Sequence, residues 1–477
     1  MPVGIGVDGR RAARAVVSVV LTSAVLLASA HHAHGQGPEP PVAKRPLGQD
    51  VPVYQPAPGD PERQEAPPFQ NPTGDVSLRD AVALALLHNP GLAAFAWETR
   101  AREARMLQAG RPPNPVITTL VQDLGGDTGL VGAADPIQAQ TTIELSQLIE
   151  LGGKRAARQR VAAADRDLAA WDYEAARIDV LTEVSRAFTD VLAAQETVAL
   201  TEETTRLVEQ VQQSVGVRVA AGVVSPIEET RANVALAAVR VESARARRSL
   251  DASRARLALL WGSPTPAFKA VVGDLKREPA PLPPIGELTA RIEQSPDLAR
   301  WAAEVSQREA VLAVERSKRV PDVAVIGGYR RYPEIDSNAF VIGASIPLPL
   351  FDRNRGGIEE ARSRLAKAHE ERRATQARVA VALTDAYAAL ASAYDEVTAL
   401  RSAVLPGSQQ TFEAVSEGYR LGRFGYLDVL ESQRTLIGAG SQYLRALSDY
   451  HKAIANVERL IGAPLAGSPA LPTTARE

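Results

Sequence analysis

The sequence contains no cysteine. This excludes disulfides, thiolate metal sites and a lipid-modified cysteine, but it does not exclude an oxidising compartment. Aromatic residues make up only 5% of the 477 residues, so the core of a large globular domain would be thin. Long helices packed side by side suit this alanine-rich composition better. The formal net charge of -2 gives no indication of a nucleic-acid partner.

Motifs for catalysis and cofactor binding are missing as well. The chain has no HExxH, no Gly-x-Ser-x-Gly and no phosphate-binding loop in a suitable context, so we expect neither an enzyme nor a cofactor. Beyond the N-terminal region, His88, His369 and His451 are the only histidines, and the whole sequence has only two methionines. This set offers no site for soft or borderline metals. No apolar run of about 18 residues follows residue 35, so no transmembrane helix is expected there.

The first 35 residues have the features of a secretory signal peptide. Three arginines precede an apolar run over residues 15–30, and small residues suited to cleavage follow. Three histidines lie at the cleavage edge: His31, His32 and His34. We interpret them as part of that edge, with a metal-binding tail as the alternative. Residues 36–76 are crowded with proline and lack apolar periodicity, which predicts a disordered leader.

Two long helical hairpins are the main pattern of the chain. Residues 216–229 and 416–431 each interrupt helical periodicity with glycine and restart a helix on acidic residues, as hairpin tips do. Gly422 lies 200 residues after Gly222. Both glycines are expected to end their helices with positive φ. The helix entering the first tip starts after residue 153 and would be on the order of 90 Å long, too long for a globular core.

The same unit therefore occurs twice. Residues 77–264 form the first repeat and residues 286–464 the second, with a proline-rich linker over residues 265–285 and a tail over residues 465–477. Between the helices of each repeat the hydrophobic period changes to two. Four stretches show it, at about residues 116–124, 137–146, 323–332 and 339–348. One face of these stretches is mostly apolar, and their length of roughly ten residues suits a tilted membrane strand.

Two groups of side chains near the strand ends have two open interpretations. Three aromatic residues could form a girdle at the membrane interface or belong to the core: Tyr329, Tyr332 and Phe340. Four basic residues at the strand-to-helix corners could lie near the headgroups of the inner leaflet or simply be solvated: Lys154, Arg155, Arg353 and Arg355.

Four strands cannot close a barrel, because the smallest transmembrane barrels have about eight and an open edge is unfavourable in lipid. The chain must therefore share a barrel with copies of itself. Three copies would give twelve strands and one helical tube, and two copies would give eight strands. We thus predict a mainly α protein with membrane β structure: duplicated long helical hairpins in an α-barrel, and four strands per protomer in a trimeric twelve-stranded transmembrane β-barrel.

Three motifs carry a family resemblance. They are Gln-Leu-Ile-Glu-Leu-Gly-Gly-Lys-Arg at residues 147–155, Pro-Leu-Pro-Leu-Phe-Asp-Arg-Asn at residues 347–354, and Gly-Tyr-Arg-Leu-Gly-Arg-Phe-Gly-Tyr-Leu-Asp at residues 418–428. With the duplicated plan, residues 77–464 resemble the TolC family of outer-membrane efflux proteins, and the motifs look like its heavy-metal branch, the outer components of cobalt-zinc-cadmium exporters. The resemblance implies a passive channel tunnel in the outer membrane of a Gram-negative bacterium, extending into the periplasm.

The partners that this resemblance implies are two further copies of the chain, outer-membrane lipid, a periplasmic adaptor and an inner-membrane RND transporter. The cargo it implies is divalent heavy-metal cations, with a multidrug or organic-compound channel as the alternative. A periplasmic adaptor is a further alternative, but it would need only one hairpin flanked by compact β domains.

The resemblance also implies roles at the tips. Tyr419, Asp428 and Glu431 match the positions that form the pore constriction, with Glu228 opposite them, and Phe424 stands where some relatives have an arginine. The alternative is structural, because Glu228 could complete a capping box with Ser225 and Asp428 lies in the first turn of a helix. Six residues are implied to receive the adaptor: Arg218, Gly222, Val223, Arg420, Gly422 and Arg423.

Overall fold

The computed structural model describes residues 71–122, 140–333 and 336–465, all within one unit of the chain, Arg45–Glu477. The predicted signal peptide with its three histidines, most of the leader, and residues 466–477 lie outside these ranges. Within them, none of the helices combines the length and the apolarity that a membrane crossing requires.

The first repeat consists of two short helices, two strands and a long helical hairpin. Its elements are β1 (Val76–Ser77), α2 (Leu78–His88), α3 (Pro90–Ala109), β2 (Val116–Gln122), β3 (Gln140–Ile149), α4 (Lys154–Ala220) and α5 (Pro226–Leu259). Ser77 and Asp80 form a capping box at the start of α2, in which the Asp80 N–H donates to Ser77 Oγ at 3.2 Å. Pro90 stands at the first position of α3, where its missing N–H costs nothing.

The second repeat has the same order. After β4 (Val271–Val272), which pairs with β1, its elements are α6 (Ile285–Arg291), α7 (Pro296–Ser317), β5 (Val323–Tyr332), β6 (Ser337–Ser345), α8 (Arg355–Ala399), α9 (Leu405–Arg420) and α10 (Tyr426–Ile461). A 3₁₀ turn, Ile292–Gln294, precedes α7, and a π-helical turn, Leu400–Val404, joins α8 to α9.

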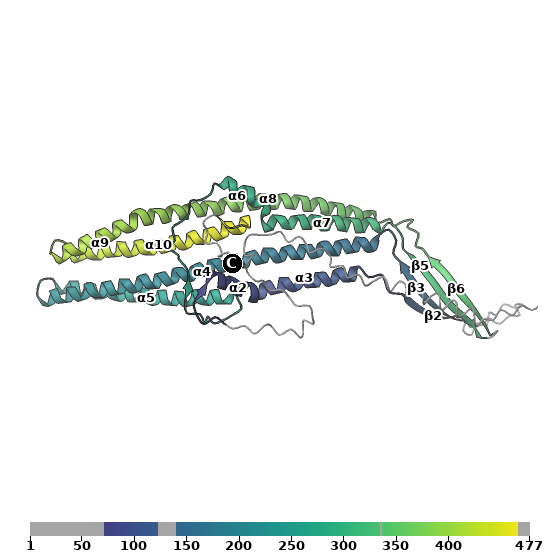
Figure 1. Ribbon diagram of the computed structural model, residues 1–477, viewed down its shortest axis with the longest axis horizontal. Coiled ribbons are helices and arrows are strands. Elements are labelled where there is room, and N and C mark those ends of the chain that lie inside the picture. Colours follow the sequence, from purple (N-terminus) through teal and green to yellow (C-terminus); the bar gives the residue numbers. More distant parts are fainter. Residues whose placement is uncertain (1–70, 123–139, 334–335, 466–477) are drawn as a thin grey trace, which may run out of the picture. The chain divides into compact units, whose positions relative to one another are not determined.

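Helix α4 is the longest element and packs against helices of both repeats (Figure 1). Its 67 residues span about 100 Å. The first hairpin tip was expected to begin at residue 216, but α4 continues through Gly216 to Ala220. A glycine inside a helix costs only about 1 kcal/mol, and Val215 and Val219, on either side of it, pack into the apolar cluster at the tip.

Two apolar cores and a cluster of ion pairs hold the helices together. One core lies within the first repeat, around the fully buried Leu86, Leu257 and Trp261. A second lies around Leu390 and Leu447 of α8 and α10. An ion-pair cluster also joins the repeats, since Arg459 of α10 contacts Asp179 of α4 at 2.6 Å and Asp297 of α7 at 3.3 Å.

The strands form one antiparallel sheet in the order β2-β3-β5-β6, visible beside the helices in Figure 1. The pairing of β3 with β5 joins the two repeats, and β2 and β6 form the edges. Strand β5 has the predicted bounds. Strand β6 ends at Ser345, so the prediction that it reaches residue 348 is wrong. Pro347 explains the early end, because it has no N–H to donate to a neighbouring strand. Residues 123–124 and 137–139 lie outside the described ranges.

The register separates an apolar from a polar sheet face, as the period of two predicts. Ile117, Leu145 and Ile342 share one row of the apolar face, and the next row includes Ile143, Tyr329 and Phe340. The rings of Tyr329 and Phe340 meet edge to face at 6.2 Å. Tyr332 belongs to the opposite face by alternation, so it does not join the other two aromatics.

The polar face of the sheet contains Thr118, Glu144 and Arg330. Arg330 Nε donates to Thr142 Oγ1 at 2.9 Å. Gly328 leaves room for Glu144, since a Cβ there would lie 2.9 Å from Glu144 Cγ.

Candidate functional site

The two hairpin tips have the same backbone geometry. Val223 N–H donates to Arg218 O at 3.0 Å, and Arg423 N–H donates to Gly418 O at 2.7 Å. Between these donors and acceptors, Gly222 and Gly422 have φ of 70° and 75°. The predicted positive φ is therefore confirmed at both tips, and each turn is a Schellman motif that satisfies the last carbonyls of its helix.

The helices that leave the tips begin differently. Asp428 Oδ2 accepts from Gly425 N–H at 2.8 Å, so this carboxylate caps α10. The predicted capping box of Ser225 and Glu228 is wrong: Ser225 Oγ accepts from Ile227 N–H at 3.5 Å instead. Glu228 Oε2 is buried and has no hydrogen-bond partner among the described residues.

Arg218 connects the two hairpins. Its guanidinium lies 4.4 Å from the centroid of the Tyr419 ring, and its Nη1 donates to Tyr419 O at 3.0 Å. The Tyr419 ring in turn lies 6.1 Å from that of Tyr426. Both rings belong to an apolar cluster that includes residues of α4, α5, α9 and α10. Tyr426 was not predicted as a site residue, although an aromatic residue directly after the tip glycines is visible in the sequence.

Burial and charge keep both phenols neutral. Burial raises the pKa of Tyr419, the cation of Arg218 opposes this, and the negative charge of Glu228 adds to it. Burial, Tyr419 and Glu228 raise the pKa of Tyr426 to about 12. The Tyr419 hydroxyl is buried and has no hydrogen-bond partner in the part of the chain that the structure describes. The negative charge of Glu228 thus acts on both phenols, while its Oε2 makes no hydrogen bond to Ser225.

The other tip residues of the candidate constriction are exposed. Asp428 and Glu431 are exposed on α10, three residues apart and hence on one face. Phe424 is 47% exposed, and its ring lies over the buried Gly418, where a Cβ would clash with it. Tyr419 is only 6% exposed in the protomer, so the structure brings it to Arg218 and Glu228 instead of leaving it beside the two carboxylates.

Of the six residues implied to receive the adaptor, five are exposed: Gly222, Val223, Arg420, Gly422 and Arg423. Arg218 is half-buried and already engaged by Tyr419. Across residues 71–122, 140–333 and 336–465, no group of three or more histidines and carboxylates is placed to hold a metal ion.

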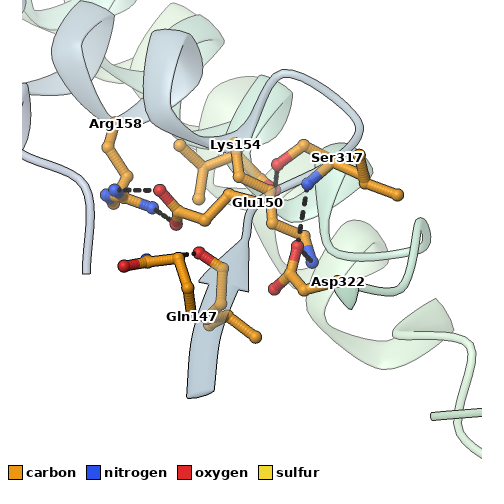
Figure 2. Close-up of polar contacts among 9 residues, drawn as sticks. Gln147, Glu150, Lys154, Arg158, Ser317 and Asp322 are labelled. Atoms are coloured by element: carbon orange, nitrogen blue, oxygen red, sulfur yellow. Dashed lines mark hydrogen bonds and ion pairs between the residues drawn. The ribbon is translucent and has the colours of Figure 1, made fainter. Parts of the chain in front are cut away.

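A second polar site lies where β3 turns into α4 (Figure 2). Lys154 Nζ contacts Asp322 Oδ1 at 2.7 Å, and Leu151 N–H donates to the same oxygen at 3.0 Å. Glu150 and Arg158 form a two-bond ion pair, in which Nη2 and Oε2 are 2.8 Å apart. These contacts connect the corner of the first repeat to the segment between α7 and β5 of the second.

The carboxylates of this corner are held in their charged form. The hydrogen bond from Arg158 lowers the pKa of Glu150. Burial alone would raise the pKa of Asp322, but the hydrogen bonds from Lys154 and from Leu151 N–H lower it. Asp322 was not anticipated, although it follows Pro321 at the repeated strand start. Three of the four basic corner residues considered above are exposed: Arg155, Arg353 and Arg355.

At the strand-to-helix corner of the second repeat, between β6 and α8, an asparagine takes the position that a glycine has in the first repeat. Gly153 (φ 71°) and Asn354 (φ 52°) stand directly before α4 and α8, both with left-handed backbone. Asn354 Nδ2 donates to Glu315 O at 2.9 Å. Both corners are therefore held near the C-terminal end of α7, the first through Asp322 and the second through Glu315.

The model of the family described as "Outer membrane efflux protein" matches residues 81–263 and 289–463, one match for each repeat. The chain belongs to this family. The family resemblance predicted from the motifs is thereby confirmed, and so is the location in the outer membrane of a Gram-negative bacterium. The two hairpins and the family match rule out a periplasmic adaptor.

Several relatives of this outer membrane efflux protein are named for metals, and two of them follow. The cobalt-zinc-cadmium resistance protein CzcC of Cupriavidus metallidurans is 36% identical over 390 residues, which cover 82% of this chain and 90% of CzcC. The nickel-cobalt-cadmium resistance protein NccC of Alcaligenes xylosoxydans xylosoxydans is 30% identical, over 72% of this chain and 73% of NccC. The crystal structure of CusC, which forms a transmembrane channel, has the same fold, with a TM-score of 0.67 at 18% identity over 87% of this chain and 99% of CusC.

Proposed function

We propose that this outer membrane efflux protein assembles as a homotrimer into the passive outer-membrane channel of a tripartite efflux system. The observation that carries the proposal is the open sheet. Among the described strands, β2 and β6 each have only one neighbour, and an edge exposed to lipid would leave backbone groups unpaired. Three copies would pair every β6 with the β2 of the next copy and close a barrel of twelve strands.

Its cargo is divalent heavy-metal cations. This rests on the relatives named for cobalt, zinc, cadmium and nickel resistance. Among the described residues no cluster of histidines and carboxylates is placed to hold a metal ion. This suits a conduit, because an ion that bound firmly inside it could not leave. Choice of ion then falls to an inner-membrane RND transporter, which is joined to this channel by a periplasmic adaptor docking on the exposed turns around Gly222 and Gly422.

The tip is also the constriction of the channel. Asp428 and Glu431 are exposed on one face of α10, and three copies around an axis would concentrate cations. Phe424, half exposed beside them, adds an apolar element to the closed state. Tyr419 holds the second hairpin to the first through its contacts with Arg218, and the charge of Glu228 acts on the Tyr419 phenol.

Growth on metals tests the cargo. A deletion strain is expected to lose resistance to zinc, cobalt or cadmium and to regain it with the wild-type gene. The same strains are compared on copper and on several drugs. Sensitivity to drugs alone, with unchanged growth on all the metals, would make the protein a multidrug or organic-compound channel instead. Native mass measurement of the protein extracted from outer membranes tests the trimer separately.

The double variant Asp428→Asn/Glu431→Gln tests the constriction. Asparagine keeps an oxygen for the Gly425 N–H, so the helix cap survives while the ring of charge disappears. We expect the preference of the purified channel for cations over anions to fall severalfold, measured as the reversal potential across a salt gradient in a planar bilayer. Glu413→Gln/Glu417→Gln, an exposed pair on α9, is the control. Equal reversal potentials for the wild type and the double variant would show that neither carboxylate lines the pore.

A further inference from the structure

Exposed apolar residues continue along the chain past the end of β6. Phe340 and Ile342 lie on the apolar face of the sheet. After β6 ends at Ser345, three further apolar residues follow at every second position: Ile346, Leu348 and Leu350. In the protomer these last three are 51%, 74% and 64% exposed, and Phe351, which follows, is 100% exposed. Residues 346–351 thus form an exposed apolar segment directly after β6, with no strand beside them.

The backbone of this segment has few hydrogen-bond donors to satisfy. Pro347 and Pro349 have no N–H, and Leu350 N–H donates to Leu348 O at 2.8 Å. Arg353 Nε donates to Pro349 O at 3.3 Å. An ordinary irregular segment would be costly at the edge of a bilayer, because its N–H groups would lose water without gaining partners. Much of that cost is absent here.

Arginines without ion pairs gather at the strand ends, and two of them, Arg353 and Arg355, directly follow this segment. Six arginines lie within ten residues of a strand end, are exposed, and have no ion-pair partner among the described residues: Arg111, Arg155, Arg316, Arg319, Arg353 and Arg355. Three of the carboxylates nearby are already engaged by cations, and the exposed Asp352 accepts from Asn354 N–H at 2.9 Å. Glu150 and Asp322 bind the corner cations, and Glu315 contacts Lys318 at 2.6 Å. The strand-to-helix junctions therefore carry an excess of positive charge next to exposed apolar side chains.

We propose that residues 346–351 insert into the inner leaflet of the outer membrane, while the six arginines bind the phosphates of anionic phospholipids. Apolar side chains with flanking cations are the pattern of an interfacial anchor. The lipid is favoured over a second copy of the chain because the apolar segment directly follows β6 and adjoins two of the arginines, and phosphate complements their charge. This inference depends on the outer-membrane location, and not on the trimer or the cargo.

Tryptophan fluorescence at position 351 tests the insertion. The Phe351→Trp protein is reconstituted in vesicles of phosphatidylethanolamine and phosphatidylglycerol with brominated acyl chains, and the signal of the four native tryptophans is subtracted. We expect strong quenching. Val381→Trp, at a 61% exposed position of α8 far along the helix, is the control and is expected to stay unquenched. Blue-shifted emission without quenching would show that another copy covers Phe351, and red-shifted emission without quenching would show water. Either result overturns the proposal.

Lipid retention tests the proposed contact between the arginines and anionic phospholipids. Wild-type protein is extracted from vesicles containing phosphatidylglycerol or phosphatidylcholine, and bound lipids are counted by native mass spectrometry. We expect the wild type to retain more phosphatidylglycerol than phosphatidylcholine. In the double variant Arg353→Gln/Arg355→Gln, this preference should fall about fivefold for each arginine removed. Arg248→Gln/Arg372→Gln, two exposed arginines on helices α5 and α8, should leave it unchanged. Equal retention of the two lipids by the wild type, or equal retention by both double variants, would refute the anionic-lipid contact. The wild-type comparison stands even if a variant fails to fold.

Discussion

Replacing Gly422 by valine is expected to abolish export while leaving the protein assembled in the outer membrane. A β-branched residue is strained at a φ of 75°, at a cost of about 1 to 2 kcal/mol. A Cβ at Gly422 would have no heavy atom within 4 Å, so the damage stays local. It falls on the turn that carries the Gly422 N–H···Tyr419 O and Arg423 N–H···Gly418 O bonds, and hence on the proposed docking surface. Growth on inhibitory zinc and the amount of protein in outer-membrane fractions are the measurements.

Gly438 supplies the matched control. It is exposed within α10, its Cβ would also meet nothing within 4 Å, and its backbone is helical. Gly438→Val should therefore leave both export and membrane level close to wild type. If Gly422→Val exported normally, the turn conformation at the second tip would have no part in docking.

Gly152→Ala is expected to remove most folded protein from the outer membrane. Its φ is 67°, and a Cβ would lie 2.7 Å from Val320 Cβ and 3.2 Å from Ser317 O. Relief of this clash would push the corner away from the end of α7 and stretch the bonds of Lys154 and Leu151 to Asp322. Strain and overpacking together amount to about 2 to 5 kcal/mol. The yield of protease-resistant protein in outer-membrane fractions, and the urea midpoint of what remains, measure the effect.

The neighbouring glycine separates the clash from the backbone strain. Gly153 has φ 71° but open space around its Cβ, so Gly153→Ala should suffer only the strain. Gly153→Asn should be milder still, because Asn354 holds the equivalent position at φ 52°. Val320→Ala should partly restore Gly152→Ala by removing the side chain it meets. Equal yields for Gly152→Ala and Gly153→Ala would disprove the close approach of the two repeats at this corner.

Local patterns in the sequence predicted much of the fold. The glycines of both tips, the start of the first repeat at residue 77 and the bounds of β5 could be predicted, because a positive φ, a capping side chain and a period of two are properties of a few adjacent residues. The duplication could be read from spacing alone. The family followed from the three motifs.

The candidate site was harder to predict than the fold. Arg218 was assigned to an external partner, but it lies on Tyr419, about 200 residues away in the sequence. Glu228 was given a local bond to Ser225, but its Oε2 is buried without a hydrogen-bond partner among the described residues. Arg218 and Tyr419 are far apart in the sequence and close in space, so local patterns could not pair them.

The repeated units, the positions at which helices turn and the family could all be predicted from the sequence. The fastening of one repeat to the other could not, since it depends on Lys154 and Asp322 at the corner and on Arg218 and Tyr419 at the tips. The two partners of each contact lie far apart along the chain. Periodicity and capping act within a few residues, whereas these contacts depend on how two long helical hairpins align over their full length.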